Sequence, residues 1–308
     1  MLYRKMPKNG DELSILGFGC MRLPVQEGKI DEARAIRQIR QAIDSGVNYL
    51  DTAWPYHAGE SEVLLGKALQ DGYRDRVRVA TKLPSWMITN RDDMDRYLDA
   101  QLKKLQTDHI DYYLLHALNG TLWDTLKPLG VLDFLEQAKQ DGRIVNAGFS
   151  FHGLADEFTR IVDAYPWVFC QIQYNYLDEN YQAGTAGLRH AAEKGLGVVV
   201  MEPLRGGNLA AATPPPAVQT IWDEAAVKRT PAEWALRWIW NLPEVTLILS
   251  GMNDEAQIEE NLAIAGTAEA NTLTQEELDL VARASRTYQE LMKVGCTGCG
   301  YCMPCNPS

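Results

Sequence analysis

The sequence predicts an α/β protein and, within that class, a (β/α)8 TIM barrel. Eight short apolar runs alternate with segments whose apolar residues recur at helical spacing, and this alternation is typical of parallel strands joined by helices. The chain has 308 residues, a length that such barrels use as a single unit. We therefore expect one barrel rather than two separate domains.

The predicted strands are short apolar runs bounded by glycine or polar turn residues. The turn Lys8-Asn-Gly-Asp11 first predicts a hairpin over residues 2–15, at a place where it would cap the bottom of the barrel. In chain order, the barrel strands are expected at 14–21, 46–50, 77–82, 110–116, 144–150, 168–173, 197–201 and 245–250.

The predicted helices follow from apolar periodicity and from their end signals. Ala35, Ile39 and Ala42 share one face of the first helix, which Gly46 ends. Thr230 opens a later helix with a capping box and a proline at the first position. Besides the helix that Thr230 opens, the predicted helices cover 31–45, 61–69, 92–105, 131–140, 153–164, 187–194 and 254–265. Residues 214–216 are expected to form a stiff proline loop.

The chain after residue 270 differs from the barrel. A capping box from Thr274 to Glu277 predicts a further helix over 274–292, and four cysteines crowd the residues after it. We therefore expect a barrel over 1–270, with its hairpin at 1–15, and a C-terminal segment over 271–308 that carries the helix and the cysteines.

Composition narrows the classes of partner. A net charge of −11 and the lack of any basic run argue against a general nucleic-acid surface. No apolar stretch approaches the length of a membrane helix, and the first residues lack the apolar core of a signal peptide. The expectation is a cytoplasmic protein that binds neither nucleic acid nor membrane.

Four polar side chains fall at or just beyond the ends of predicted strands. Asp51 and Tyr56 follow the second barrel strand, Lys82 ends the third, and His116 ends the fourth. Strand ends of a parallel barrel point to one common site. Taken singly, each residue would be a solvated loop residue or a structural one, but four in this order favour a catalytic group.

The pattern D-T-A-x-x-Y, then T-K, then L-L-H resembles the catalytic tetrad of the aldo-keto reductase family. Further blocks match the family in order between residues 16 and 261: Leu16 to Met21, Ser61 to Leu69, Gln171, Pro203-Leu204 and Glu260-Asn261. The resemblance implies an enzyme that interconverts a carbonyl and an alcohol of a small molecule with NAD(P)H.

Each member of the tetrad has a chemical reason to be there. Hydride addition to a carbonyl needs a proton donor, and Tyr56 can supply the proton. A phenol with a pKa of about 10 is a weak acid at neutral pH, so Lys82 is expected to lower the pKa of Tyr56 while Asp51 holds Lys82 in place. Neutral His116 would orient the substrate oxygen. The alternatives are a non-catalytic nucleotide-binding barrel, similar to a channel β-subunit, and an electron-transfer protein.

The resemblance also implies a cofactor site. The family's phosphate clamp carries cations at the positions of Gly251 and Gln257, so their absence favours relaxed preference or NADH over the NADPH usual in the family. Met201 replaces the tyrosine that stacks on the nicotinamide. The implied cofactor residues are Gly19, Cys20, Met21, Asp51, Ser150, Gln171, Met201, Pro203, Leu204, Arg205 (a candidate phosphate contact), Gly207, Gly251, Gln257, Glu260 and Asn261.

Substrate recognition is open in the sequence. Arg22 either grips an acidic substrate or pairs with a loop carboxylate. The aromatic residues that follow strand ends either line a pocket or pack the loops: Trp54, Trp86, Trp123 and Phe151.

Cysteine placement predicts a metal site. Cys20 and Cys170 follow apolar runs and are expected to be small buried residues. The last four cysteines form contiguous C-x2-C steps, which favour iron–sulfur ligation over zinc, because zinc sites separate such pairs more widely. The tail resembles the start of the ferredoxin-like segment in a subgroup of the family, but Asn306 follows the last cysteine where proline is expected. The expected ligands of a [4Fe-4S] cluster, which would imply a redox partner, are Cys296, Cys299, Cys302 and Cys305.

Overall fold

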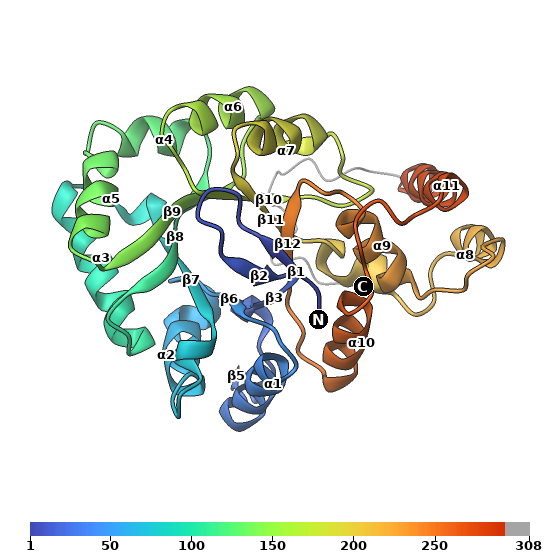
Figure 1. Ribbon diagram of the computed structural model, residues 1–308, viewed down its shortest axis with the longest axis horizontal. Helices are drawn as coiled ribbons and strands as arrows, with labels where there is room; N and C mark the ends of the chain where they lie inside the picture. The colour runs from blue at the N-terminus through green and yellow to red at the C-terminus, as the bar shows by residue number, and fades with distance from the viewer. Residues whose placement is uncertain (293–308) are drawn as a thin grey trace.

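The computed structural model describes residues 1–292, in which the predicted (β/α)8 barrel is confirmed. Eight parallel strands close in the order β10-β11-β12-β3-β6-β7-β8-β9, and the helices form a ring around them (Figure 1). The strands are β3 (Leu16–Gly19), β6 (Tyr49–Asp51), β7 (Arg78–Leu83), β8 (Ile110–Leu118), β9 (Ile144–Phe151), β10 (Phe169–Gln173), β11 (Gly197–Met201) and β12 (Val245–Ser250).

The outer helices start and stop close to the predicted ends. For example, Asp31 caps the first helix by accepting from the amide of Arg34. Thr230 caps its helix in the same way, but Glu233 turns its carboxylate to Arg237 instead of completing the capping box. The helices are α1 (Glu32–Asp44), α2 (Ser61–Ala68), α3 (Arg91–Leu105), α4 (Gly120–Leu126), α5 (Val131–Gln140), α6 (Ala155–Asp163), α7 (Gly184–Glu193), α8 (Pro216–Asp223), α9 (Pro231–Trp240), α10 (Glu255–Ala265) and α11 (Gln275–Leu291).

Some elements differ from the prediction. Pro216 is the first residue of α8 rather than part of a stiff loop, because proline is preorganised for a first helical turn. Helix α4 was not predicted, although Asn119 caps it by accepting from the amide of Leu122. A small antiparallel pair, β4 (Val25–Gln26) and β5 (Lys29–Ile30), was also missed, since runs of two residues carry no periodicity.

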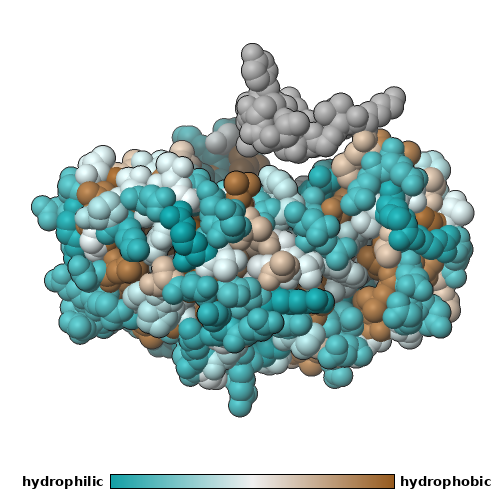
Figure 2. Space-filling view, turned by 90° about the horizontal axis from the view of Figure 1, so that it is seen from above, coloured by the Kyte–Doolittle hydropathy of each residue, from teal (hydrophilic) through white to brown (hydrophobic). Residues whose placement is uncertain are grey.

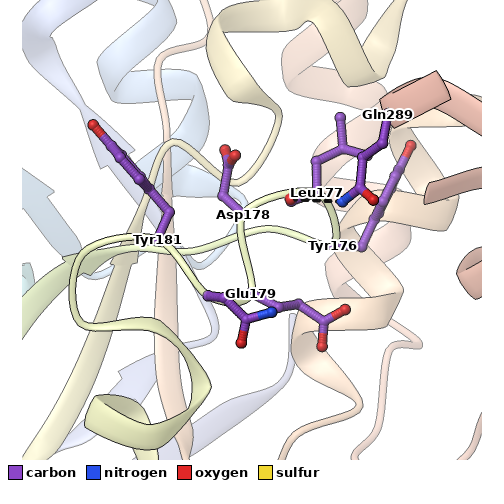
Figure 3. A pocket seen from close by; sticks show the side chains of 7 residues that line it. Tyr176, Leu177, Asp178, Glu179, Tyr181 and Gln289 are labelled. Carbon is purple, nitrogen blue, oxygen red and sulfur yellow. Dashed lines mark hydrogen bonds between the residues drawn. The ribbon is translucent and has the colours of Figure 1, made fainter. Parts of the chain in front are cut away.

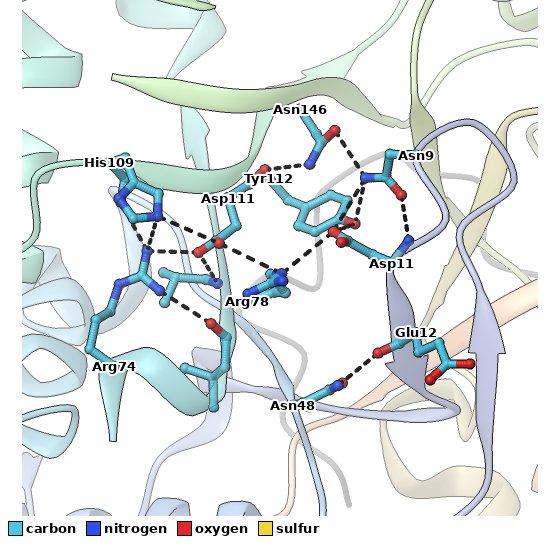
Figure 4. Close-up of polar contacts among 12 residues, drawn as sticks. Asn9, Asp11, Glu12, Asn48, Arg74, Arg78, His109, Asp111, Tyr112 and Asn146 are labelled. Carbon is cyan, nitrogen blue, oxygen red and sulfur yellow. Dashed lines mark hydrogen bonds and ion pairs between the residues drawn. The ribbon is translucent and has the colours of Figure 1, made fainter. Parts of the chain in front are cut away.

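The predicted N-terminal hairpin is confirmed and closes one end of the barrel. Strands β1 (Tyr3–Lys5) and β2 (Glu12–Ser14) pair across the Lys8–Asp11 turn, and they cross the centre of the barrel in Figure 1. Asn9 in the turn donates to the hydroxyl of Tyr112 at 3.1 Å and to the side chain of Asn146 at 3.0 Å. These contacts, drawn in Figure 4, fill the end opposite to the carboxyl ends of the strands with a satisfied polar network.

The barrel interior and the layer between strands and helices are packed with apolar side chains. Phe169, Tyr49 and Tyr112 are fully buried inside the barrel, and the ring of Tyr112 contacts the other two rings. The surface seen in Figure 2 is mainly hydrophilic, with apolar residues scattered over it. None of the helices in residues 1–292 is long and apolar enough to cross a membrane.

Helix α11 packs outside the barrel and ends beside two loops at the carboxyl ends of strands. Ser285 donates to the carbonyl of Tyr176 at 2.7 Å, and Gln289 donates to the carbonyl of Leu177 at 3.4 Å. Met292, just after the helix, contacts Arg205 in the loop after β11. The predicted division at residue 270 falls in the connection between α10 and α11, and the predicted cysteine cluster at 296–305 lies outside the described residues.

Candidate active site

The four predicted catalytic residues converge at the carboxyl ends of three adjacent strands. Asp51 is the last residue of β6, Lys82 lies near the end of β7, and His116 lies near the end of β8. These strands are neighbours in the barrel, with Asp51 in register with Ala80 and Lys82 in register with Leu114. Tyr56 begins the short helical turn η2 (Tyr56–Gly59) after β6.

Lys82 is the centre of the group. Its ammonium donates to the Oδ1 atom of Asp51 at 2.6 Å, to the carbonyl of Thr52 at 2.7 Å and to the hydroxyl of Tyr56 at 3.4 Å. The Lys82 side chain is fully buried, so its charge must be satisfied by these oxygens. The ammonium also lies 4.9 Å from the centre of the Tyr56 ring.

Burial and charge compete in setting the protonation of these residues. Burial disfavours the charged form of Lys82, but Asp51 and Tyr56 outweigh it, so the pKa of Lys82 is raised and the ammonium persists. Burial raises the pKa of Tyr56, and the charge of Lys82 opposes this shift only in part. The predicted lowering of the Tyr56 pKa was therefore wrong in its net direction, because burial dominates. In this structure Tyr56 is a protonated donor over the ordinary pH range.

His116 is neutral and faces the same site. Burial lowers the pKa of His116 well below its usual value, and the neighbouring charges of Lys82 and of His152 lower it further. The ring of His116 lies edge-on to Tyr56, 6.1 Å between centres. Its Nδ1 atom is buried without a hydrogen-bond partner among the described residues. The predicted neutral imidazole is thus supported by its surroundings.

The backbone beside His116 is unusual and is held in place by a predicted cofactor residue. Ala117 has a φ of 54°, in the left-handed region that residues other than glycine rarely adopt. Its amide donates to the hydroxyl of Ser150 at 2.7 Å. Ser150 therefore stabilises the bend in β8 beside His116, and its own hydroxyl donates to no acceptor within residues 1–292.

The predicted nicotinamide residues surround the tetrad. Gln171 donates through Nε2 to the sulfur of Met201 at 3.5 Å, whereas its buried Oε1 atom has no partner within residues 1–292. Gly19 ends β3 where an added Cβ would lie 3.4 Å from the carbonyl oxygen of Ser250. Cys20 is fully buried, and Met21 is 59% exposed beside it.

The predicted pyrophosphate loop follows β11 and is tightly folded. Arg205 has a φ of 47°, and the next two glycines, at 206 and 207, have φ values of 68° and 102°. Pro203 is buried and Leu204 packs on the apolar core. The Nε atom of Arg205 lies 3.2 Å from the carboxylate of Asp178, so the candidate phosphate contact is held by a partner from another loop.

The predicted adenine and phosphate positions lie around the start of α10. Asn261 is buried and donates to the hydroxyl of Ser250 at 3.1 Å, and Glu260 accepts from the hydroxyl of Thr230 at 2.7 Å. Gln257 is exposed, and its side-chain oxygen accepts from the amide of Asn253. Neither Gly251 nor Gln257 supplies the cation that the family carries at its position.

Arg22 lies on the cofactor side rather than over the tetrad. Its aliphatic carbons stand where a side chain at position 251 would lie, since a Cβ added to Gly251 would meet them at 3.2–3.4 Å. Its guanidinium donates to the carbonyl of Gly206 at 3.5 Å. Of the two roles considered for Arg22, pairing with a loop carboxylate is not found within residues 1–292, and gripping an acidic substrate stays a prediction.

Of the predicted aromatic pocket residues, only Trp86 lies exposed beside the tetrad. It is 48% exposed, with its ring 5.0 Å from that of His116. Trp54 turns to α3, where its face meets the ammonium of Lys104. Trp123 is buried against other aromatic rings in the outer layer, and Phe151 is buried against α6. Trp123 and Phe151 therefore do not line an open pocket: Trp123 lies within α4 and packs on Trp167, and Phe151, the last residue of β9, packs on Phe158 of α6.

Two residues of this site were missed in the sequence. Thr52 binds Lys82 through its backbone carbonyl, a contact that no residue type signals. Asp178 follows the end of β10, and this is the same signal, a carboxylate just beyond a strand, that identified Asp51. The predicted burial of Cys20 and Cys170 is confirmed. No cluster of possible metal ligands occurs in residues 1–292.

Comparison with known proteins agrees with this geometry. A model of the Aldo/keto reductase family matches residues 15–286. The L-galactose dehydrogenase of Arabidopsis thaliana is 29% identical over 299 residues, covering 90% of this chain and 92% of that protein. The oxidoreductase YqkF of Bacillus subtilis is 26% identical over 325 residues, covering 95% and 99%. The holo form of aldo-keto reductase AKR11C1 from Bacillus halodurans has a TM-score of 0.77 at 26% identity, covering 92% of this chain and 96% of that chain.

The chain belongs to the aldo/keto reductase family. It is an NAD(P)H-dependent oxidoreductase that interconverts carbonyls and alcohols, as the family resemblance in the sequence implied.

Proposed function

We propose that this enzyme reduces the carbonyl of a small molecule with Tyr56 as the proton donor. The observation that carries the proposal is the position of Lys82, whose buried ammonium touches both Asp51 and Tyr56. Neutral His116 on the adjacent strand completes the group.

Each residue has one task in this proposal. A bound nicotinamide supplies the hydride. Tyr56 donates its proton to the substrate oxygen as negative charge develops there. Lys82 stabilises the resulting phenolate, and Asp51 keeps the ammonium in place. His116 is neutral, so it can donate a hydrogen bond to the substrate oxygen without bringing a competing charge.

The residues around the tetrad fit a nicotinamide nucleotide. The Oε1 atom of Gln171, which has no partner within residues 1–292, is a suitable acceptor for a carboxamide N–H. The hydroxyl of Ser150, which donates to no acceptor in the same range, suits the carboxamide carbonyl. Met201 offers a sulfur contact to the ring. Arg205 is the proposed phosphate contact, and the other nucleotide residues proposed are those of the sequence prediction. Because Gly251 and Gln257 carry no charge, NADPH and NADH should bind with similar strength.

The substrate is proposed to be an uncharged small carbonyl or alcohol. Arg22, for which the sequence left open an acidic substrate or a loop carboxylate, lies against Gly251 and Gly206. The similarity to an L-galactose dehydrogenase makes aldoses the first group to test.

The decisive variant is Tyr56→Phe. It removes only the hydroxyl, so we expect kcat to fall by about 10²–10⁴-fold while the Kd of NADPH changes little. The assay is a panel of aldehydes, ketones, aldoses and alcohols with both nicotinamides under anaerobic conditions. Near-normal turnover by Tyr56→Phe would reject the proton donor. Nucleotide binding without turnover by the wild type would favour the non-catalytic barrel instead.

We also propose that the C-terminal cysteines bind a [4Fe-4S] cluster. Four thiolates at contiguous C-x2-C spacing are a donor set suited to iron–sulfur ligation, and free thiolates so close together would oxidise readily. Anaerobic purification should give a brown protein with iron and sulfide in similar amounts. Cys299→Ser should lose both, whereas Cys170→Ala, at a buried isolated cysteine, should keep them. Zinc alone, or no metal, in the wild type would reject the cluster, and with it a redox partner acting through it.

A further inference from the structure

We infer that Asp178 is a positioning residue for the nucleotide, because it holds Arg205 in the orientation that meets the phosphates. The inference rests on the proposed function of Arg205. It adds a residue from a different strand loop, whose side-chain partners within residues 1–292 do not include the tetrad.

Two hydrogen bonds and one ion pair meet at one oxygen of Asp178. The Oδ2 atom accepts from the side-chain amides of Asn175 at 2.9 Å and Gln173 at 3.2 Å, and it lies 3.2 Å from the Nε atom of Arg205. The Asp178 side chain is 13% exposed and that of Arg205 is 25% exposed. A pair so shielded is stronger than one at the open surface.

The contact is one of several that join the loop after β10 to the loop after β11. Asn175 and Asp178 belong to the loop after β10, whereas Arg205 belongs to the loop after β11. Asn175 also donates to the carbonyl of Glu202 at 3.3 Å. Arg205 and Glu202 have positive φ values of 47° and 54°, a conformation that costs free energy and persists where surrounding contacts hold it.

Arg205 is restrained at its other end as well. Its Nη1 atom lies 3.3 Å from the sulfur of Met292, just beyond α11. With Nε within ion-pair distance of Asp178 and Nη1 donating to Met292, the guanidinium is restrained at both ends. A preorganised arginine loses less entropy when it binds a phosphate than a mobile one would.

The neighbouring carboxylate provides a matched control. Asp178 and Glu179 both line a cavity of about 240 Å³ that Gln289 of α11 also borders. Figure 3 shows their carboxylates directed to opposite sides of the loop backbone. No ion pair of Glu179 is recorded in residues 1–292, so Glu179→Gln changes the charge of the same loop without touching Arg205.

The test is a double-mutant cycle on the full chain, read as the Kd of NADPH by fluorescence titration. Asp178→Asn keeps the shape and removes the charge, and we expect it to raise the Kd about tenfold, while kcat at saturating NADPH stays within about twofold. Asp178→Glu should recover part of the affinity. Glu179→Gln should leave the Kd unchanged.

The cycle separates positioning from a general structural role. In an Arg205→Met background, Asp178→Asn should have little further effect, because Asp178 acts through Arg205. Equal effects in both backgrounds, or an unchanged Kd in Asp178→Asn, would overturn the inference. An unchanged Kd in Arg205→Met would also overturn it, without affecting the role of Tyr56. Failure of the wild type to bind either NADPH or NADH would overturn both this inference and the proposed function.

Discussion

Replacing Lys82 by methionine should destabilise the protein in a way that depends on pH. Lys82 is fully buried, and its ammonium lies 2.6 Å from Oδ1 of Asp51, whose Oδ2 atom has no other partner among the described residues. Methionine fills similar space but leaves Asp51 buried without a counter-charge. The carboxyl can then remain buried only by taking up a proton.

The size of the effect follows from the cost of that proton. With an unfolded-state pKa of about 3.9 and about 1.4 kcal/mol per pH unit, protonating Asp51 in the folded state costs at most about 4 kcal/mol at pH 7 and about 2 kcal/mol at pH 5.5. The sign is that of a carboxyl whose folded-state pKa is raised: stability is full below the unfolded pKa and falls as pH rises. Removing one partner of a buried ion pair typically costs about 3–5 kcal/mol, in agreement with the value of about 4 kcal/mol at pH 7.

The assay is urea unfolding of wild type and Lys82→Met at pH 7 and pH 5.5. The double variant Asp51→Asn, Lys82→Met should be more stable than Lys82→Met at pH 7 by about 2 kcal/mol, because no buried charge remains, and it should lose most of the pH dependence. It should nevertheless stay inactive. Lys67→Met is the control, since the Lys67–Glu32 pair is exposed on both sides and should contribute below about 1 kcal/mol. Equal destabilisation by Lys82→Met at the two pH values would refute the reasoning.

Three further predictions follow from other parts of the molecule. Burial raises the pKa of Tyr56, so carbonyl reduction should stay level from pH 6 to about 9, whereas alcohol oxidation, which needs the phenolate, should rise throughout; a fall in reduction near pH 7 would contradict this. The wild type should bind NADPH no more than about tenfold tighter than NADH, and Gln257→Arg should widen that ratio of Kd values in paired titrations. A strong wild-type preference for NADPH would show that another cation clamps the phosphate. Asn9→Ala removes the hydrogen bonds to Tyr112 and Asn146 at the opposite end of the barrel. It should therefore lower the free energy of unfolding by about 1–3 kcal/mol and leave kcat unchanged. A loss of activity without a loss of stability would contradict the placement of Asn9 far from the tetrad.

The sequence alone determined the barrel and the order of its catalytic group. Both depend on local chemistry: strand runs, helical periodicity and capping residues act over a few positions, and parallel strand ends must share one face. For this reason the sequence by itself predicts that Asp51, Lys82 and His116 lie close together. The small pair β4–β5 and helix α4 were missed because short segments carry little periodicity.

Only the tertiary structure decided how the side chains around that group are directed and charged. Trp123 and Phe151 follow strand ends, yet they pack under the helices. Arg22 lies on the nucleotide side because of contacts with Gly251 and Gly206, which are distant in sequence. The pKa of Tyr56 rises because burial, a property of the whole assembled site, outweighs the charge of Lys82. Burial and long-range contact are sums over many residues, so no local pattern in the sequence specifies them.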